Sequence, residues 1–288
     1  METLKLQGEL IEFTTKDGVT LNGFIQKSKP NNKSIVIHQH GLSGNFYYST
    51  LAFDLPLGLT GTKYDFFSSN NRGSGLITRF KTKQGKKTIG TAFEKFEDCV
   101  FDIDAAIKVA QERGYKEIVL SGQSTGCQKI AYYQSKTQSK KIKALLLLAP
   151  GDDYNSQKME LGKKFVKVIK LAKKMVATKK GNSFLPPLGY LFTAKRYLSN
   201  AGEKSNEAQL FNYAGKLNLF SKIKIPMLAM FGSKEKYLER TPAEALQKLR
   251  EVTKSKKLIT VEVAGANHQF QGYEDEAVEN IIAFLNTL

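Results

Sequence analysis

One short stretch constrains the fold of this chain more than any other. The apolar residues 118–120 run into the sequence Gly-Gln-Ser-Thr-Gly at positions 122–126, and helix-forming residues follow. A strand, a sharp turn and a helix in this order are the context of a nucleophile elbow, in which the turn lifts a serine hydroxyl clear of a sheet. Glycine is needed at both ends of the motif, because a side chain there would collide with the packed strand and helix. The stretch therefore predicts that Ser124 is a nucleophile.

The rest of the chain predicts a sheet around this turn. Apolar runs bounded by turn residues indicate strands, and they alternate with segments whose apolar residues have helical spacing. This alternation is typical of a mostly parallel sheet with helices on both faces, whose functional loops lie at the carboxyl ends of the strands. The expected strands are 9–14, 21–26, 34–38, 64–68, 118–121, 142–149, 226–232 and 258–263.

Three local signals refine this picture. Asp17-Gly18 predicts a turn that joins the first two strands into a hairpin. Thr91 and Glu94 have the spacing of a capping box, which predicts the start of a helix that Gly114 ends. Residues 79–90 are basic without an apolar period, so we expect a loop there. Further helices are expected at about 47–57, where Pro56 would end the first of them, and at 127–133, 159–178, 242–252 and 275–285.

The alternation of strands and helices breaks after Pro150. About seventy residues precede the next clear strand, far more than a normal connection. They contain the Lys-rich helix 159–178, a break at Pro186-Pro187, and an aromatic-rich stretch that includes Tyr190. We therefore expect an α/β core formed by residues 1–150 and 223–288 with a helical cap at residues 151–222.

Composition narrows the class of protein. The chain has 288 residues, of which 41% are hydrophobic, so it can form one large α/β domain with an insertion. No apolar run approaches the ~20 residues that a membrane span requires. Residues 1–6 lack the apolar core of a secretory signal, and Cys99 and Cys127 alone make no disulfide framework. A cytoplasmic protein is expected.

The net charge of +17 raises the question of an anionic partner. Almost all of the positive charge is lysine, whereas proteins that read bases or clamp phosphates favour arginine. No alternation of aromatic and basic residues typical of RNA binding is present. We therefore expect a solvated Lys-rich surface and no nucleic-acid partner. The lysines of helix 159–178 leave open a peripheral contact with an anionic membrane or an acidic substrate.

Several motifs, in the correct order along nearly the whole chain, resemble those of the α/β-hydrolase superfamily. The resemblance is closest to cap-bearing esterases of the monoglyceride-lipase-like and serine-aminopeptidase-like group. It implies the α/β-hydrolase fold, with a mostly parallel doubly wound sheet and an inserted helical cap. The segments that resemble the HGxxG, DxRGxG, GHSxG, GxxD and GxxH motifs of that group are residues 40–44, 70–75, 122–126, 232–235 and 265–268.

The resemblance also implies a catalytic triad. In this superfamily the histidine follows the nucleophile in the chain, and His268 is the only histidine after Ser124. Glu235 stands where the family usually has aspartate, and glutamate is accepted in that role. Asp152 and Asp153 are the alternative acids, because some members of the fold have the acid at the end of the preceding strand.

An oxyanion hole needs two backbone N–H groups aimed at the developing negative charge. One is expected from Thr125, at a helix N-terminus directly after the nucleophile, and the other from Leu42. His38 and His40 are then expected to fix the shape of the loop through hydrogen bonds. Two histidines at one strand end with no convincing third ligand make a weak metal site, so no metal is expected.

These features together predict a serine hydrolase that cleaves a carboxylic ester through an acyl-enzyme. Aromatic and aliphatic residues between 151 and 222 are expected to bind a small, partly apolar acyl or aryl ester. No cofactor is expected. A thioesterase, lipase or peptidase could use the same residues. A non-catalytic binding protein with a basic cap is a further alternative, although such a protein would need neither Ser124 nor His268.

Overall fold

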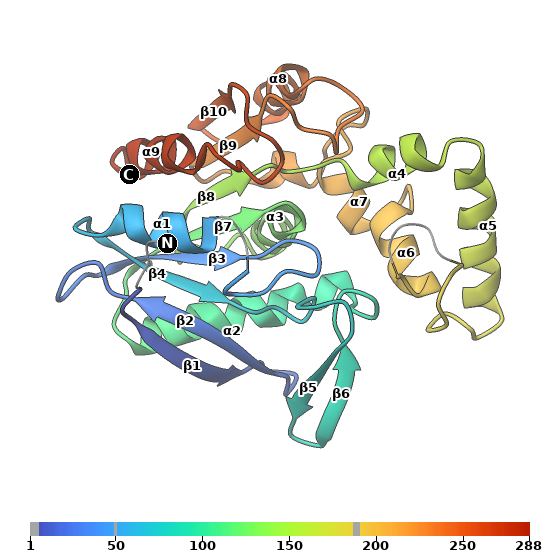
Figure 1. The fold of residues 1–288 in the computed structure, drawn as a ribbon, viewed down its shortest axis with the longest axis horizontal. Helices are drawn as coiled ribbons and strands as arrows, with labels where there is room; N and C mark the ends of the chain where they lie inside the picture. Colours follow the sequence, from blue (N-terminus) through green and yellow to red (C-terminus); the bar gives the residue numbers. More distant parts are fainter. Residues whose placement is uncertain (1–5, 49–50, 187–190) are drawn as a thin grey trace.

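The computed structural model describes residues 6–48, 51–186 and 191–288. Within these residues, an eight-stranded sheet forms the centre of the molecule (Figure 1). Its strands are β1 (Glu9–Thr14), β2 (Thr20–Gln26), β3 (Ser34–Gln39), β4 (Tyr64–Ser69), β7 (Glu117–Gln123), β8 (Ile142–Leu148), β9 (Met227–Gly232) and β10 (Leu258–Val263). Their order in the sheet is β1-β2-β4-β3-β7-β8-β9-β10.

The sheet is mostly parallel, as predicted. Only β2 pairs antiparallel with its two neighbours, β1 and β4, and the described pairs from β4 to β10 are all parallel. Every residue of β3, β4 and β9 is buried, which explains the apolar runs at residues 35–37 of β3 and throughout most of β9. The elbow strand β7 lies between β3 and β8, so it is a central strand of the sheet.

Helices pack against this sheet in pairs. Helix α1 packs against α9, and α2 packs against α3 (Figure 1). The bounds are α1 (Leu51–Leu59), α2 (Cys99–Glu112), α3 (Thr125–Thr137), α8 (Pro242–Val252) and α9 (Glu274–Leu285), with short 3-10 turns η1 (Phe96–Asp98) and η2 (Phe220–Lys222). The predicted helices 242–252 and 275–285 are confirmed, the second with one additional residue at its start.

Two predictions within the N-terminal half of the chain are wrong. Residues 79–90 are not a loop, because β5 (Thr78–Thr82) and β6 (Gly85–Ile89) form an antiparallel hairpin. Only Phe80 and Ile89 of these two strands are buried, so exposed polar and basic residues hide the apolar alternation. Pro56 does not end α1 but lies inside it, where its buried ring contributes to the core.

The capping box predicted at Thr91 and Glu94 is also wrong, because α2 begins only at Cys99, after η1. The Thr91 hydroxyl instead donates a hydrogen bond to the Gly73 carbonyl oxygen at 2.8 Å. The Glu94 carboxylate binds the Lys129 ammonium at 2.8 Å. Both side chains are therefore used in tertiary contacts rather than in a helix N-terminus.

The segment between β8 and β9 projects to one side of the sheet (Figure 1). Some of its buried apolar residues, including Phe165, Phe192 and Tyr197, form a cluster separate from the main core, whereas those from Leu210 to Ile223 belong to the main core. The break predicted at Pro186-Pro187 and the aromatic Tyr190 involve residues 187–190, which lie outside the described part. Its helices are α4 (Asp153–Leu161), α5 (Lys164–Ala177), α6 (Ala194–Ala201) and α7 (Asn206–Leu210).

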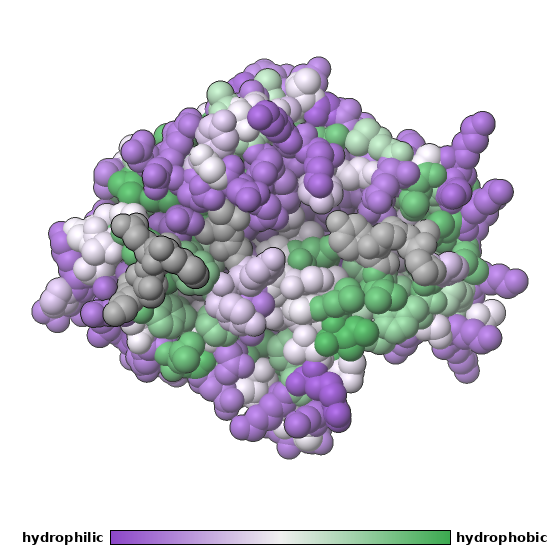
Figure 2. Space-filling model, viewed as in Figure 1, coloured by the Kyte–Doolittle hydropathy of each residue, from purple (hydrophilic) through white to green (hydrophobic). Residues whose placement is uncertain are grey.

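The single helix predicted at 159–178 is two helices, because Gly162 between α4 and α5 has a φ of +49°. Such a backbone conformation strongly favours glycine and interrupts a helix. The α5 lysines are exposed, and hydrophilic residues cover much of the face shown in Figure 2. In the described part of the chain, no helix combines the length and apolar character that crossing a membrane requires.

Candidate active site

The strained turn predicted at Ser124 is present. Ser124 connects β7 to α3 with φ 53° and ψ −125°, a conformation that is rare for a residue with a side chain. A Cβ atom added to Gly122 would lie 2.5 Å from the backbone of Gly126. One added to Gly126 would collide with the carbonyl oxygen of Gln39 on β3. The steric argument for both glycines is therefore confirmed.

A cavity of about 750 Å³ opens at this turn. Its walls include Ser124 and His268, and also Leu42 and Thr125. The sheet topology therefore brings together residues from three distant parts of the chain at the carboxyl ends of β3, β7 and β10. Other wall residues are the aromatic Tyr47, Tyr48, Phe53, Phe192 and Tyr237 and the amides Gln123, Gln157, Asn200, Gln269 and Gln271.

His268 lies beside the carboxylate of Glu235. The distance from His268 Nδ1 to Glu235 Oε2 is 2.6 Å, and the Glu235 side chain is fully buried. The other carboxylate oxygen accepts hydrogen bonds from the backbone N–H groups of Lys236 and Tyr237, at 2.8 and 2.9 Å. An ionised carboxylate only accepts, so the proton of the His268 bond belongs to Nδ1. In a neutral ring this leaves Nε2 free to accept a proton.

The Tyr237 ring supports this arrangement. It packs edge-on against the His268 ring, with the two centroids 4.6 Å apart. Because its own N–H also binds Glu235, Tyr237 contacts both members of the pair. No motif in the sequence identified Tyr237, because its role follows from how two loops meet.

The two alternative acids have other partners. The Asp152 carboxylate caps α4 by accepting from the backbone and side-chain N–H groups of Asn155, at 2.9 and 2.8 Å, and it also accepts from the Tyr213 N–H. Asp153 lies in the cavity wall and accepts from the Gln128 amide at 3.0 Å. Burial raises the pKa of both carboxyl groups.

His38 and His40 both form hydrogen bonds, but only the bond of His40 lies within the 40–44 loop, because His38 bonds to Ser121 on the neighbouring strand β7. His38 Nδ1 lies 3.0 Å from the Ser121 hydroxyl, and His40 Nδ1 lies 2.8 Å from the Gly41 carbonyl oxygen. Burial lowers the pKa of His38 to about 4, and burial with the nearby Lys129 charge lowers that of His40 to about 3. Both rings are therefore neutral at pH 7. In the part of the chain with assigned positions, no three His, Cys, Asp or Glu side chains cluster as metal ligands would.

The loop formed by residues 40–44 approaches the elbow closely. A Cβ atom on Gly41 would lie 3.0 Å from the Cβ of Ser124 and from the carbonyl oxygen of Gln123, so a side chain there would be crowded against the elbow. Leu42 follows in the same loop, and Thr125 is the first residue of α3. Both residues line the cavity, as an oxyanion hole would require.

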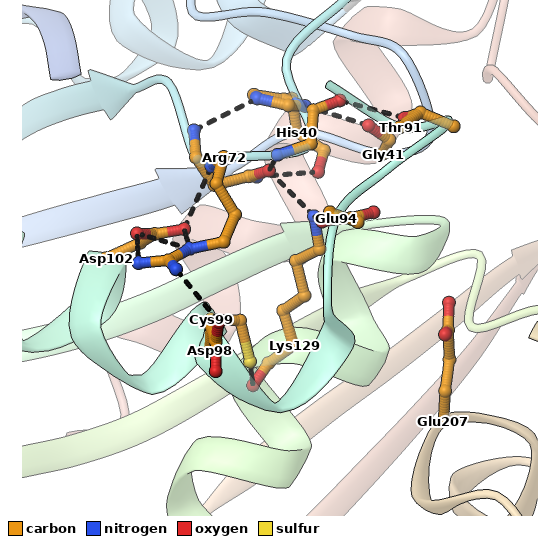
Figure 3. Close-up of polar contacts among 12 residues, drawn as sticks. His40, Gly41, Arg72, Thr91, Glu94, Asp98, Cys99, Asp102, Lys129 and Glu207 are labelled. Atoms are coloured by element: carbon orange, nitrogen blue, oxygen red, sulfur yellow. Dashed lines mark hydrogen bonds and ion pairs between the residues drawn. The ribbon is translucent and has the colours of Figure 1, made fainter. Parts of the chain in front are cut away.

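Sequence reasoning missed a chain of buried charges beside the site (Figure 3). Glu94 binds Lys129 of α3 at 2.8 Å and Arg196 of α6 at 3.2 Å, and Arg196 also binds Glu207 at 2.6 Å. Although burial alone would raise it, the two cations hold the pKa of Glu94 below its ordinary value. Partners so far apart in the chain leave no local pattern that could have identified them.

The fold has solved relatives of low sequence identity. The Pyrococcus furiosus esterase Pf2001 is 17% identical, with 99% of this chain and 92% of that chain covered and a TM-score of 0.67. Est1E from Butyrivibrio proteoclasticus, solved with ferulic acid, is 15% identical over 96% of this chain and 98% of that chain, with a TM-score of 0.67. The siderophore hydrolase EstB from Aspergillus fumigatus is 16% identical over 100% and 99%, with a TM-score of 0.69.

These likenesses confirm the predicted fold class, the α/β-hydrolase fold. A search by sequence against curated proteins gives no match. One family, described as a protein of unknown function (DUF1749), matches residues 85–286, which is most of the chain. The chain therefore belongs to the DUF1749 family.

Proposed function

We propose that this protein is a serine hydrolase that cleaves carboxylic esters through an acyl-enzyme. Ser124 is the nucleophile, His268 the general base and Glu235 the acid that orients it. The observation that carries the proposal is the 2.6 Å contact between His268 Nδ1 and Glu235 Oε2, in the wall of the cavity that Ser124 also lines. A base oriented by a buried carboxylate, in the same cavity as a strained serine, is the combination that nucleophilic catalysis requires.

The first step forms the acyl-enzyme. The Ser124 oxygen attacks the ester carbonyl carbon while its proton passes to His268 Nε2. The carbonyl electron pair moves onto the oxygen, and the N–H groups of Leu42 and Thr125 stabilise that negative charge. Collapse of the tetrahedral intermediate breaks the bond to the alcohol oxygen, which takes the proton from His268. Glu235 stabilises the imidazolium cation throughout this step.

The second step reverses these roles. Water enters as the alcohol leaves, and His268 removes a proton from it as it attacks the acyl carbon. The same two N–H groups bind the new oxyanion, and Ser124 recovers its proton from His268 when the acid is released. Two successive half-reactions of this kind give ping-pong kinetics.

The walls of the cavity support an acyl or aryl ester of moderate size. Its volume of about 750 Å³ is within the range of small-molecule sites, and aromatic Phe53, Phe192 and Tyr237 provide apolar surface. Amide side chains in the same walls can bind polar substituents. Two of the structural relatives are named as an esterase and a siderophore hydrolase, which supports a hydrolase here.

We also propose that residues 151–222 act as a cap over a core of residues 1–150 and 223–288. This segment contributes Asp153, Gln157, Phe192 and Asn200 to the cavity walls, so it can select the substrate. The position of this segment between β8 and β9 supports placement among cap-bearing esterases of the monoglyceride-lipase-like and serine-aminopeptidase-like group.

A fluorophosphonate probe tests this function directly. The probe reacts covalently with an activated serine, so the folded wild type and the exposed control Ser183→Ala should both be labelled. Ser124→Ala should not be labelled and should lose hydrolysis of 4-nitrophenyl butyrate. A folded wild type that neither labels nor hydrolyses short esters would contradict the proposal and favour a binding protein with the same fold.

A further inference from the structure

Residues 90–94 lie between two parts of the site that are distant in sequence. On one side, the Thr91 hydroxyl accepts a hydrogen bond from the Ser43 N–H in the 40–44 loop, at 2.8 Å. On the other side, the Ala92 carbonyl oxygen accepts from the hydroxyl of Thr193, which caps α6, at 2.9 Å. The stretch predicted to begin a helix therefore connects the 40–44 loop to the proposed cap.

A chain of charged groups makes a second connection beneath it. Arg196 Nη2 of α6 binds one oxygen of Glu94 at 3.2 Å, and Lys129 Nζ binds the other at 2.8 Å. Lys129 Nζ also donates to the Asn71 side-chain oxygen at 2.7 Å. The side chains of Arg196, Glu94 and Lys129 are at most 1% exposed, so water does not screen these interactions. Figure 3 shows Lys129 reaching from α3 toward Glu94, below His40 and Gly41.

This series of contacts continues through Asn71 into the 40–44 loop. The Asn71 N–H donates to His40 Nε2 at 3.2 Å, which assigns the ring proton to Nδ1. Nδ1–H then donates to the Gly41 carbonyl oxygen at 2.8 Å. That oxygen and the N–H of Leu42 belong to the same planar trans peptide, so they point in opposite directions. A bond that fixes the Gly41 oxygen therefore also fixes the direction of the Leu42 N–H.

Stability alone does not account for this arrangement. Buried ion pairs can often be replaced by apolar residues without loss of stability, because burial of each charge costs much of what pairing returns. The 70–75 loop lies very close to these charges, since a Cβ atom on Gly73 would lie 2.5 Å from Glu94 Oε2 and 2.7 Å from Lys129 Nζ. The arrangement is better explained by its effect on the Gly41–Leu42 peptide, where the series of contacts ends.

We propose that Arg196 and Glu94 are positioning residues for the oxyanion hole, which link the position of α6 to the direction of the Leu42 N–H. The inference rests on the proposed function, because Leu42 is taken there as an oxyanion donor. Helix α6 also contributes Asn200 to the cavity wall. A substrate that contacts α6 thus acts on the same helix that orients the donor, so substrate binding and transition-state stabilisation are coupled.

The test uses Arg196→Lys, which keeps the charge but cannot bind Glu94 and Glu207 together as the planar guanidinium does. With 4-nitrophenyl butyrate, kcat should fall about tenfold and KM should change less than about twofold, since complete loss of an oxyanion donor costs ~100- to 1000-fold. The inhibition constant of a trifluoromethyl ketone should rise by the same factor as kcat/KM falls. Arg113→Lys, which alters the exposed pair with Glu9, is the matched control and should change none of these.

An independent readout separates this inference from the proposed function. The amide ¹H and ¹⁵N chemical shifts of Leu42 should change in Arg196→Lys and stay the same in Arg113→Lys. If the wild type does not react with fluorophosphonate, the proposed function fails, and the Leu42 shifts alone decide whether α6 is linked to the loop. An unchanged Leu42 signal, or an unchanged kcat in an active enzyme, would overturn the inference. If Arg196→Lys does not fold, the isosteric Glu94→Gln is measured in the same way.

Discussion

At the scale of single residues, the proposed site depends on which carboxylate orients His268. Three acids were possible from the sequence, and Glu235 is the one whose oxygen lies 2.6 Å from the imidazole. Its second oxygen is held by two backbone N–H groups, so its position does not depend on a flexible side-chain partner. Asp152 has a structural role at the start of α4. We therefore infer that Glu235 is the triad acid.

Glu235→Gln tests this assignment. Glutamine is nearly the same shape but carries no charge, so it neither stabilises the imidazolium nor maintains the required tautomer. We expect kcat for 4-nitrophenyl butyrate to fall by about 10³- to 10⁴-fold, as for the equivalent change in other triads. Fluorophosphonate labelling should slow in parallel, while the urea midpoint of unfolding confirms that the variant is folded.

Asp152→Asn and Asp153→Asn are the matched controls, because each removes one rival carboxylate with little change in volume. Asp153→Asn should keep kcat within about threefold of wild type, since burial already favours the neutral acid there. If Glu235→Gln retains full turnover and either control loses it while folded, the acid is an aspartate at the start of α4.

At the scale of elements, the sequence predicted best where one physical effect dominated. Strands buried on both faces favour apolar runs, as in residues 35–37 of β3 and nearly all of β9, so these strands could be recognised directly. The β5–β6 hairpin was missed because it buries only Phe80 and Ile89. Thr91 and Glu94 had the correct spacing for a helix cap, but tertiary contacts determined their conformation.

The α4–α5 corner is an element whose shape depends on one residue. Gly162 has φ +49° and ψ −126°, and no atom lies within 4 Å of where its Cβ would be. Gly162→Ala therefore introduces backbone strain without a steric clash. We expect the free energy of unfolding to fall by about 1–3 kcal/mol, measured by urea titration. Lys163→Ala, one residue later and exposed, should change it by less than about 0.5 kcal/mol. Equal stability of both variants would show that the corner relaxes freely.

At the scale of the whole molecule, positive charge is divided between two roles. The α5 lysines are exposed, as expected for a solvated surface, whereas Arg72 and Arg196 are among the largest fully buried side chains. Arg72 binds Asp102 at 2.8 Å and so holds the 70–75 loop against α2. Composition showed that most of the positive charge is lysine, but it could not show that Arg72 and Arg196 are buried in the protein interior. Ser124 and His268 could be identified because each lies in a short motif of neighbouring residues. Glu94 and Arg196 are distant in sequence and meet only in the folded chain.

The pH dependence of global stability provides a further prediction. Burial lowers the pKa of His38 from 6.5 to about 4 in the folded protein. As the pH falls below 6.5, the unfolded chain binds a proton at this position while the folded chain does not, so folding is progressively disfavoured until the pH reaches about 4. Other titrating groups act in both directions, which makes the total curve unsuitable for isolating one histidine.

Comparison of wild type with His38→Gln isolates this effect, because all other groups cancel in the difference. Between pH 7 and pH 5, the wild type should lose about 2 kcal/mol more unfolding free energy than the variant, since one histidine is protonated only in the unfolded state. Urea titrations at intervals of half a pH unit measure the difference. Parallel curves for the two proteins would mean that folded His38 accepts a proton near its ordinary pKa, which would require water or an acid to reach its ring. A difference between the two curves that changes with the slope of one proton below pH 6 would instead show that folded His38 stays neutral in its buried position at the carboxyl end of β3.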